Sequence, residues 1–131
     1  MKLSDLEKAI TYSWYKDTSA DSENWSNENQ SYGQCAVTAL IVQDYLGGKI
    51  VNSLVDVGER KESHYFNNIN GTEIDLTGDQ FPEGTVIPEG VDKKKDFETT
   101  RDYVLSYGPT AERYEVLKRR VDDCLDFIIK P

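Results

Sequence analysis

Apolar side chains recur every three or four residues at both ends of the chain. This spacing predicts an amphipathic helix over residues 3–15 and a second one over residues 110–129. The apolar positions of the first are Leu3, Leu6, Ile10 and Trp14. Those of the second are Tyr114, Leu117, Val121, Leu125 and Ile128. A stripe of this kind is typical of a helix that packs one face on a core.

The middle of the chain has a different pattern. Residues 34–46 are apolar on most sides, which predicts a buried central helix that ends at Gly47-Gly48. A strand is expected to follow, over residues 49–57. The order of these elements predicts an α+β fold, in which the central helix packs on a small antiparallel sheet between the N- and C-terminal helices.

The clearest local signal is Asn70-Gly71, which lies between two strand-like runs, residues 64–69 and 72–77. This dipeptide predicts a hairpin with a two-residue turn. If Ile69 pairs with Thr72, one face of the hairpin carries His64, Phe66, Asp75 and Thr77, and the other carries Tyr65, Ile69, Ile74 and Leu76. Diagonal neighbours lie about 7–8 Å apart, within reach of two polar side chains, whereas a slip of one residue would separate them.

Two long segments lack any periodic pattern. Residues 16–31 are polar except for Trp25, and residues 78–100 contain Pro82-Glu83-Gly84 and Pro88-Glu89-Gly90. We expect both to be irregular surface segments that shape a pocket. Trp25 either covers a site and binds substrate or anchors its loop on the core.

Composition narrows the class of protein. The chain has 131 residues with 37% hydrophobic and 30% charged side chains, which predicts one domain over residues 1–131. Its formal charge of -9 disfavours binding to nucleic acid or to an anionic membrane. Neither a membrane span nor a signal peptide is expected, so the expected location is the cytoplasm. The oligomeric state stays open.

Cysteine and histidine are scarce. Cys35 and Cys124 do not form a disulfide framework by number or spacing, so both are expected to be thiols. With a single histidine beside them, the chain lacks the usual ligands of a structural zinc site, and we expect no metal and no cofactor. Cys124 lies beside the apolar stripe of the last helix and is expected to be an inert packed thiol.

Cys35 stands just inside the predicted central helix, behind a glycine. A helix start favours the thiolate form that a nucleophile needs, an imidazole such as His64 takes and returns its proton, and a carboxylate such as Asp75 orients the imidazole. These three residues are the candidate catalytic set. The amide of Cys35 and a group of Gln34 are the expected oxyanion donors, and Gly33 allows a sharp turn before them. Trp25, Tyr32 and Phe66 are the candidate substrate-binding aromatics.

A resemblance supports this site. Tyr32-Gly33-Gln34-Cys35 looks like the nucleophile segment of transglutaminases, and His64-Tyr65-Phe66 with Ile74-Asp75-Leu76-Thr77 is similar to their histidine and aspartate strands. Over about residues 5–120 the chain resembles a small bacterial family of YunG-like proteins, through Gly-Gln-Cys-Ala-Val-Thr-Ala-Leu, the pair Gln80-Phe81 and a late Arg113-Tyr114. The resemblance implies a papain-like or transglutaminase-like core with a Cys-His-Asp triad.

This sequence departs from transglutaminases and papains at Ala36, where they have an aromatic residue, and it is short. These departures count against protein cross-linking and broad proteolysis. The first interpretation is a cysteine-dependent hydrolase or acyltransferase that acts on an amide, ester or thioester of a small molecule, peptide or protein. The alternative is a non-catalytic binding module of the same fold, so whether the chain is an enzyme stays open.

Overall fold

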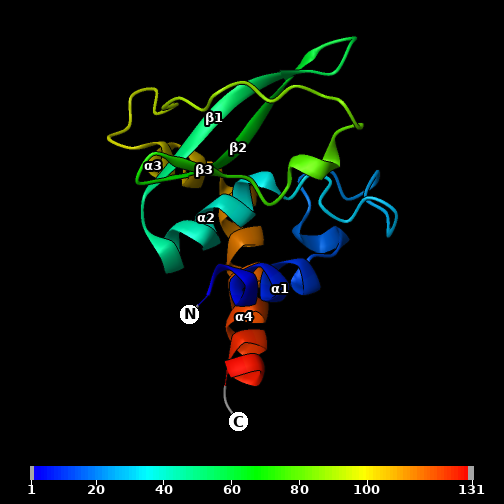
Figure 1. Ribbon diagram of the computed structural model, residues 1–131, viewed down its shortest axis with the longest axis vertical. Helices are drawn as coiled ribbons and strands as arrows, with labels where there is room; N and C mark the ends of the chain where they lie inside the picture. The colour runs from blue at the N-terminus through cyan, green and yellow to red at the C-terminus, as the bar shows by residue number, and fades with distance from the viewer. Residues whose placement is uncertain (1, 130–131) are drawn as a thin grey trace.

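A small antiparallel sheet lies against a group of helices in the computed structural model, which describes residues 2–129 (Figure 1). The elements in chain order are α1 (Leu3–Ser13), a 3₁₀ turn (Lys16–Thr18), α2 (Cys35–Leu46), β1 (Lys49–Asp56), β2 (Lys61–Ile69), β3 (Thr72–Ile74), a second 3₁₀ turn (Gly78–Gln80), α3 (Thr100–Leu105) and α4 (Gly108–Ile129). The strand order is β1-β2-β3. The expected α+β class, with a small antiparallel sheet and flanking helices, is therefore confirmed, and the sheet has three strands.

The helix ends differ from the prediction by one or two residues. α1 stops at Ser13 because Trp14 is already extended, with a ψ of 140°. α4 begins at Gly108, so Pro109 falls in its first turn, where a missing N–H breaks no helical hydrogen bond. Residues 100–105 form a helix, and the side chain of Thr99 caps it by accepting a hydrogen bond from the Asp102 amide at 3.0 Å.

The predicted hairpin register is confirmed. Ile69 pairs with Thr72 and Asn67 pairs with Ile74 across the turn. Asn70 and Gly71 have φ angles of 53° and 86°, which is the left-handed turn that Asn-Gly favours. β3 ends at Ile74, three residues earlier than predicted, so Asp75 lies just beyond the strand.

The main core lies between the helices and one face of the sheet. Its fully buried side chains include Leu6, Ile10, Leu40, Leu117 and Val121. Tyr65, Ile69 and Leu76 from the predicted apolar face of the hairpin pack against this core. Asn67 Nδ2 donates to the carbonyl oxygen of Ala39 at 3.0 Å, which fixes β2 on α2.

The opposite face of the sheet is also covered. His64 is fully buried there and Phe66 is 3% exposed, because the segment that follows the second 3₁₀ turn crosses above them. Asn52 and Val91 exchange two backbone hydrogen bonds of 2.8 Å. A Cβ on Gly90 would lie only 2.9 Å from Phe66 Cζ, so this close approach needs glycine.

The loop before α2 folds back on its own end. Ala20 N donates to the Gly33 carbonyl oxygen at 2.9 Å, and Ser19 Oγ donates to the Tyr32 carbonyl oxygen at 2.8 Å. Gly33 has a φ of 72°, and a Cβ there would collide with Ser19 Oγ and lie 3.0 Å from Ala20 N. The turn into Cys35 therefore depends on the absence of a side chain at position 33.

Among residues 2–129, none of the helices combines the length and the apolar character that a bilayer crossing requires.

Replacing Gly33 with alanine is expected to lower the free energy of unfolding by about 3 kcal/mol, because left-handed strain and overpacking each cost about 1–2 kcal/mol. Gly84→Ala is the matched control, since Gly84 has a φ of 87° and no atom lies within 4 Å of its added Cβ. In Gly84→Ala the free energy of unfolding is expected to fall only by the cost of left-handed strain, about 1–2 kcal/mol. Urea unfolding measures both values, and equal losses would contradict the close packing at Gly33.

Candidate active site

Cys35 is the first residue of α2. Gln34 precedes it as the N-cap, and the Gln34 carbonyl oxygen accepts the first helical hydrogen bond, from Thr38 N, at 3.0 Å. The amide of Cys35 has no acceptor within the helix, since the first four amides of any helix lack one. The half-buried free thiol therefore sits at the positive end of the helix dipole, where a thiolate is favoured.

His64 and Asp75 form an ion-pair-type hydrogen bond. His64 Nε2 lies 2.7 Å from Asp75 Oδ2, with the histidine side chain fully buried and the aspartate side chain 20% exposed. The other carboxylate oxygen of Asp75 accepts a hydrogen bond from Thr77 N at 3.1 Å. The carboxylate is thus held from two sides, which fixes the direction in which it presents Oδ2 to the ring.

Two aromatic rings confine the imidazole. Phe66 stacks on His64 with ring centroids 5.5 Å apart, and Phe81 meets it edge-on at 5.0 Å. Since Phe66 comes from β2 and Phe81 from the segment above the sheet, the ring is held between two parts of the fold. Its orientation is therefore set before any ligand binds.

The charge state of His64 depends on its neighbours. Burial lowers the pKa of His64, but hydrogen bonds to Asp75 and Cys35, together with attraction to both charges, outweigh burial and raise it to about 9. The ring is then an imidazolium at neutral pH, beside the Cys35 sulfur. Because Nε2 faces Asp75, Nδ1 is the ring nitrogen that the carboxylate leaves unoccupied.

Gln80 is part of this site, and the sequence analysis did not assign it a role. Its Oε1 accepts a hydrogen bond from Gly33 N at 3.3 Å, and its Nε2 lies 3.4 Å from His64 Nδ1. The same Nε2 donates to the Thr77 carbonyl oxygen at 3.2 Å. One amide therefore contacts both the turn before Cys35 and the histidine ring. Its Nε2 contact with Nδ1 is not a hydrogen bond while His64 is charged, because both groups are then donors. The only sequence signal was its place in the Gln80-Phe81 pair.

A cavity of about 290 Å³ opens at Cys35. The loop before α2 contributes Tyr32, β2 contributes Tyr65, and α4 contributes Arg113. Gln80 completes the part of the wall next to the thiol. Of the three predicted substrate-binding aromatics, Tyr32 alone is among the residues that line this cavity.

Gln34 does not reach the cavity. Its side chain is fully buried, Nε2 donates to the Tyr15 carbonyl oxygen at 2.9 Å, and its backbone N donates to the Ser31 carbonyl oxygen at 3.0 Å. The backbone donor and one side-chain N–H are occupied away from the cavity, and Gln34 is not among the residues that line it, so this geometry does not fit the expected oxyanion role. The residue instead ties the end of α1 to the start of α2.

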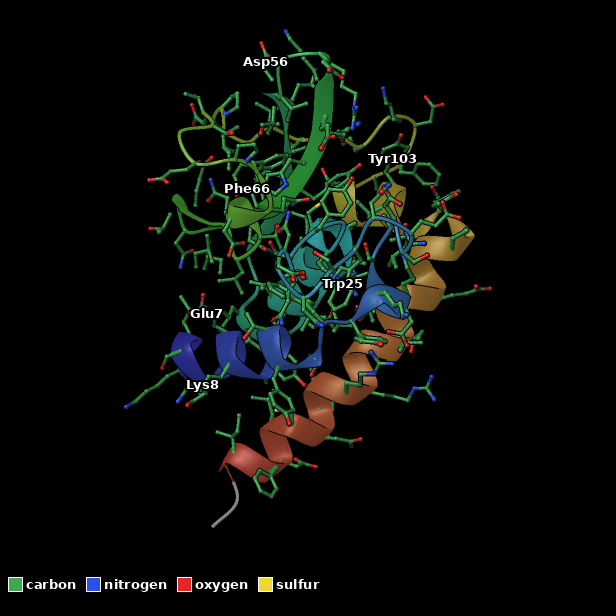
Figure 2. The ribbon with its side chains drawn as sticks, turned by 90° about the vertical axis from the view of Figure 1, so that its right-hand side faces the viewer. Glu7, Lys8, Trp25, Asp56, Phe66 and Tyr103 are labelled. Atoms are coloured by element: carbon green, nitrogen blue, oxygen red, sulfur yellow. The ribbon has the colours of Figure 1, made fainter. Side chains whose placement is uncertain are left out.

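Trp25 and Phe66 also lie away from the cavity. Trp25 packs edge-on against Tyr15 at 5.1 Å, and its Nε1 donates to the Gln30 carbonyl oxygen at 2.8 Å. Trp25 thus stabilises its own loop, and Phe66 supports His64 from behind. Figure 2 shows the two rings on separate parts of the fold, Phe66 on the sheet and Trp25 in the loop before α2.

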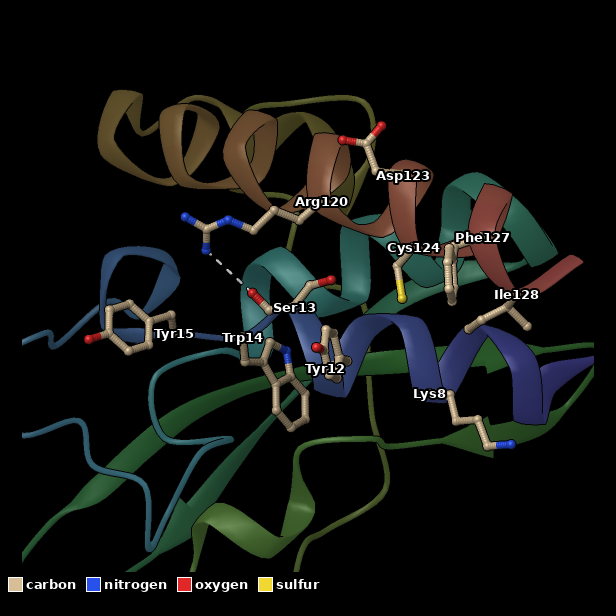
Figure 3. A pocket seen from close by; sticks show the side chains of 10 residues that line it. All are labelled: Lys8, Tyr12, Ser13, Trp14, Tyr15, Arg120, Asp123, Cys124, Phe127 and Ile128. Carbon is tan, nitrogen blue, oxygen red and sulfur yellow. Dashed lines mark hydrogen bonds between the residues drawn. The ribbon is translucent and has the colours of Figure 1, made fainter. Parts of the chain in front are cut away.

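A larger cavity, of about 920 Å³, lies between α1 and α4 (Figure 3). Cys124 faces it beside Phe127 and Ile128, so this thiol is half-buried and sits among apolar side chains. The single histidine lies at Cys35, so Cys124 has no imidazole partner. Within residues 2–129, no group of three or more His, Cys, Asp or Glu side chains is placed to hold a metal ion.

The ring protons of His64 are expected to titrate well above pH 6.5 in an NMR experiment, near the raised pKa of about 9. The assignment needs no mutant, because the chain has one histidine. Asp75→Asn is expected to lower this pKa, since it removes the carboxylate. Asp79→Asn is the matched control, because Asp79 accepts from Ser31 Oγ at 2.7 Å and does not touch the ring.

The same shift predicts how stability depends on pH. A folded pKa above the unfolded value stabilises the protein fully below about pH 6.5, and this contribution is lost as pH rises through about 9. The free energy of unfolding is therefore expected to fall over this interval, and to fall less in Asp75→Asn. A titration near or below pH 6.5 in the unmodified protein would contradict the coupled site.

Comparison with known proteins places the chain in a family. A 72-residue stretch is 42% identical to "Uncharacterized protein YunG" of Bacillus subtilis (strain 168), covering 55% of this chain and 56% of the relative. The match thus spans a little over half the length of that curated relative. No solved structure matches the chain. The family model described as "YunG protein" matches residues 2–126, and the chain therefore belongs to the YunG family.

Proposed function

We propose that this protein is a cysteine-dependent hydrolase or acyltransferase that acts on an amide, ester or thioester carbonyl. One observation carries the proposal: the single histidine is hydrogen-bonded through Nε2 to Asp75 at 2.7 Å, and Cys35 contributes to the raised pKa of that histidine, about 9. A nucleophile, a proton carrier and an orienting carboxylate are the three roles that such catalysis needs.

In the first step, the thiolate of Cys35 attacks the carbonyl carbon and forms a C–S bond, while the π electrons of the carbonyl move to its oxygen. The tetrahedral intermediate then re-forms the carbonyl and expels the leaving nitrogen, oxygen or sulfur, which takes the proton from Nδ1 of His64 and departs as an amine, alcohol or thiol. The product of this half-reaction is a thioester on Cys35. Asp75 orients the ring and stabilises the imidazolium before the proton leaves.

In the second step, neutral His64 takes a proton from the attacking molecule. Attack by water gives hydrolysis, and attack by an amine or alcohol gives acyl transfer. The C–S bond breaks with its electron pair on sulfur, which restores the thiolate and the imidazolium. The two outcomes differ only in which acceptor reaches the thioester.

The oxyanion donors differ from those expected. The amide of Cys35 keeps its role, because helix geometry leaves it without an internal acceptor. Gln80 Nε2 replaces Gln34 as the second donor, since Gln80 lines the cavity with Cys35. Its present hydrogen bond to the Thr77 carbonyl, at 3.2 Å, is long enough to be exchanged for one to a developing negative charge.

The papain-like or transglutaminase-like core remains part of the proposal. The order Cys35, His64, Asp75 and a helix that begins at the cysteine and packs on the histidine strand support it. Ala36 and a cavity of about 290 Å³ favour a small molecule or a peptide end over a folded protein as substrate. A free nucleophilic thiol suits a reducing compartment, so we propose a cytoplasmic location.

An activated ester such as p-nitrophenyl acetate tests the covalent step. Mass spectrometry after an acid quench is expected to show one acetyl group on Cys35 and none on Cys124. His64→Gln is expected to slow acetylation about 100-fold, the usual contribution of a proton carrier. Cys124→Ser is the control and is expected to acetylate at the normal rate. Equal acetylation of the two cysteines, or an unchanged Cys35 acetylation rate in His64→Gln, would contradict the mechanism. The non-catalytic binding module would then be the remaining interpretation.

A further inference from the structure

Arg113 stands in the wall of the Cys35 cavity without a carboxylate partner. Its Nη2 donates to Thr110 Oγ1 at 3.1 Å, and Thr110 lines the same cavity. Its Nε is buried and has no hydrogen-bond acceptor among the described residues. No ion pair joins Arg113 to any of residues 2–129. A guanidinium has five N–H donors, so most of its capacity is unused.

The two acidic residues of the cavity are engaged elsewhere. Asp21 accepts hydrogen bonds from Asn24 Nδ2 at 2.8 Å and from the Tyr32 hydroxyl at 3.2 Å. Glu62 is paired with Arg60 at 2.6 Å. Each carboxylate of the cavity lining therefore has its own donors. Arg113 feels the charge of the neighbouring Glu112, which is not among the lining residues, but forms no ion pair with it.

This arrangement leaves a partly buried cation with few protein acceptors. Burial removes water from a cation, and it lowers the pKa of Arg113 by disfavouring the charged form. A hydrogen bond from one hydroxyl does not replace that hydration. An anion in the cavity would supply both the missing charge and the missing acceptors.

We propose that Arg113 binds a carboxylate of the substrate, so that the molecule acylating Cys35 carries a free carboxylate close to the reacting carbonyl. The inference rests on the proposed function and adds the chemical class of the substrate to it. The planar guanidinium fork matches a carboxylate, and a cavity of about 290 Å³ holds a short acyl group together with one such end group.

The net charge of -9 makes the local group necessary. Long-range repulsion from an acidic protein opposes an anionic substrate, although salt screens it beyond about 8–10 Å. Selection of a carboxylate therefore has to come from contact inside the cavity. Arg113, on α4, lines the same cavity as Cys35 and can make that contact.

Two alkylating reagents of similar shape test the proposal. Iodoacetate carries a carboxylate, whereas iodoacetamide is its neutral analogue, and both react with thiolates. The rate with iodoacetate divided by the rate with iodoacetamide is expected to be about fivefold higher at Cys35 than at Cys124. A factor of this size is what one partly buried charge pair contributes. Arg113→Gln is expected to remove this excess, and because the iodoacetamide rate of the same variant is the denominator, any general change in Cys35 reactivity cancels. Arg119→Gln, which deletes an exposed arginine of the same helix, is expected to retain it.

Competition on the unmodified protein gives a second test that does not depend on a stable variant. Acetate is expected to slow the reaction of iodoacetamide with Cys35 and not with Cys124. Protection by inorganic phosphate without protection by acetate would overturn the carboxylate assignment.

The two proposals fail in different ways. An iodoacetamide rate at Cys35 no higher than at Cys124 would overturn the nucleophile itself. A second outcome would overturn the carboxylate site alone. In it, iodoacetamide reacts faster with Cys35 than with Cys124, but the iodoacetate-to-iodoacetamide rate ratio at Cys35 is the same in the unmodified protein, Arg113→Gln and Arg119→Gln.

Discussion

The hydrogen bond between His64 and Asp75 is the interaction on which the rest of the site depends. It exists only in the register that pairs Ile69 with Thr72, since a slip of one residue would turn His64 to the other face of the sheet. It occupies Nε2 of the ring, so Nδ1 is the nitrogen that remains for the proposed proton exchange with the thiol. It also makes a fully buried imidazolium tolerable, because a buried charge without a partner would instead lose its proton.

Separate segments meet around this pair, and glycine permits two of the close approaches. Gly33 brings the loop before α2 against its own end, and Gly90 lets the segment after Phe81 lie on the sheet above His64. Gln80 then connects the turn at Gly33 with the ring. The short β3 contributes as well, because its end at Ile74 frees Asp75 to be held by Thr77. The geometry of the site therefore depends on how the loops pack against the sheet.

Local signals made part of this predictable. Asn70-Gly71 fixed the hairpin, and a glycine before an apolar run marked the helix that begins at Cys35, so the meeting of His64 and Asp75 followed from the pattern. Gln34 is buried beside Cys35 because consecutive residues at a helix start point about 100° apart, so a neighbour of Cys35 in sequence faces the core. Gln80 and Arg113 come from distant segments that no local pattern relates to Cys35, so only the folded chain reveals them.

The pH dependence of Cys35 alkylation tests the central claim most directly. If His64 and Asp75 hold the sulfur as a thiolate, Cys35 reacts with iodoacetamide at pH values well below those at which Cys124 reacts, and His64→Gln abolishes the difference. Cys124 serves as the internal reference, since it lies in the other cavity without an imidazole. Identical pH profiles for the two cysteines in the unmodified protein would contradict the account.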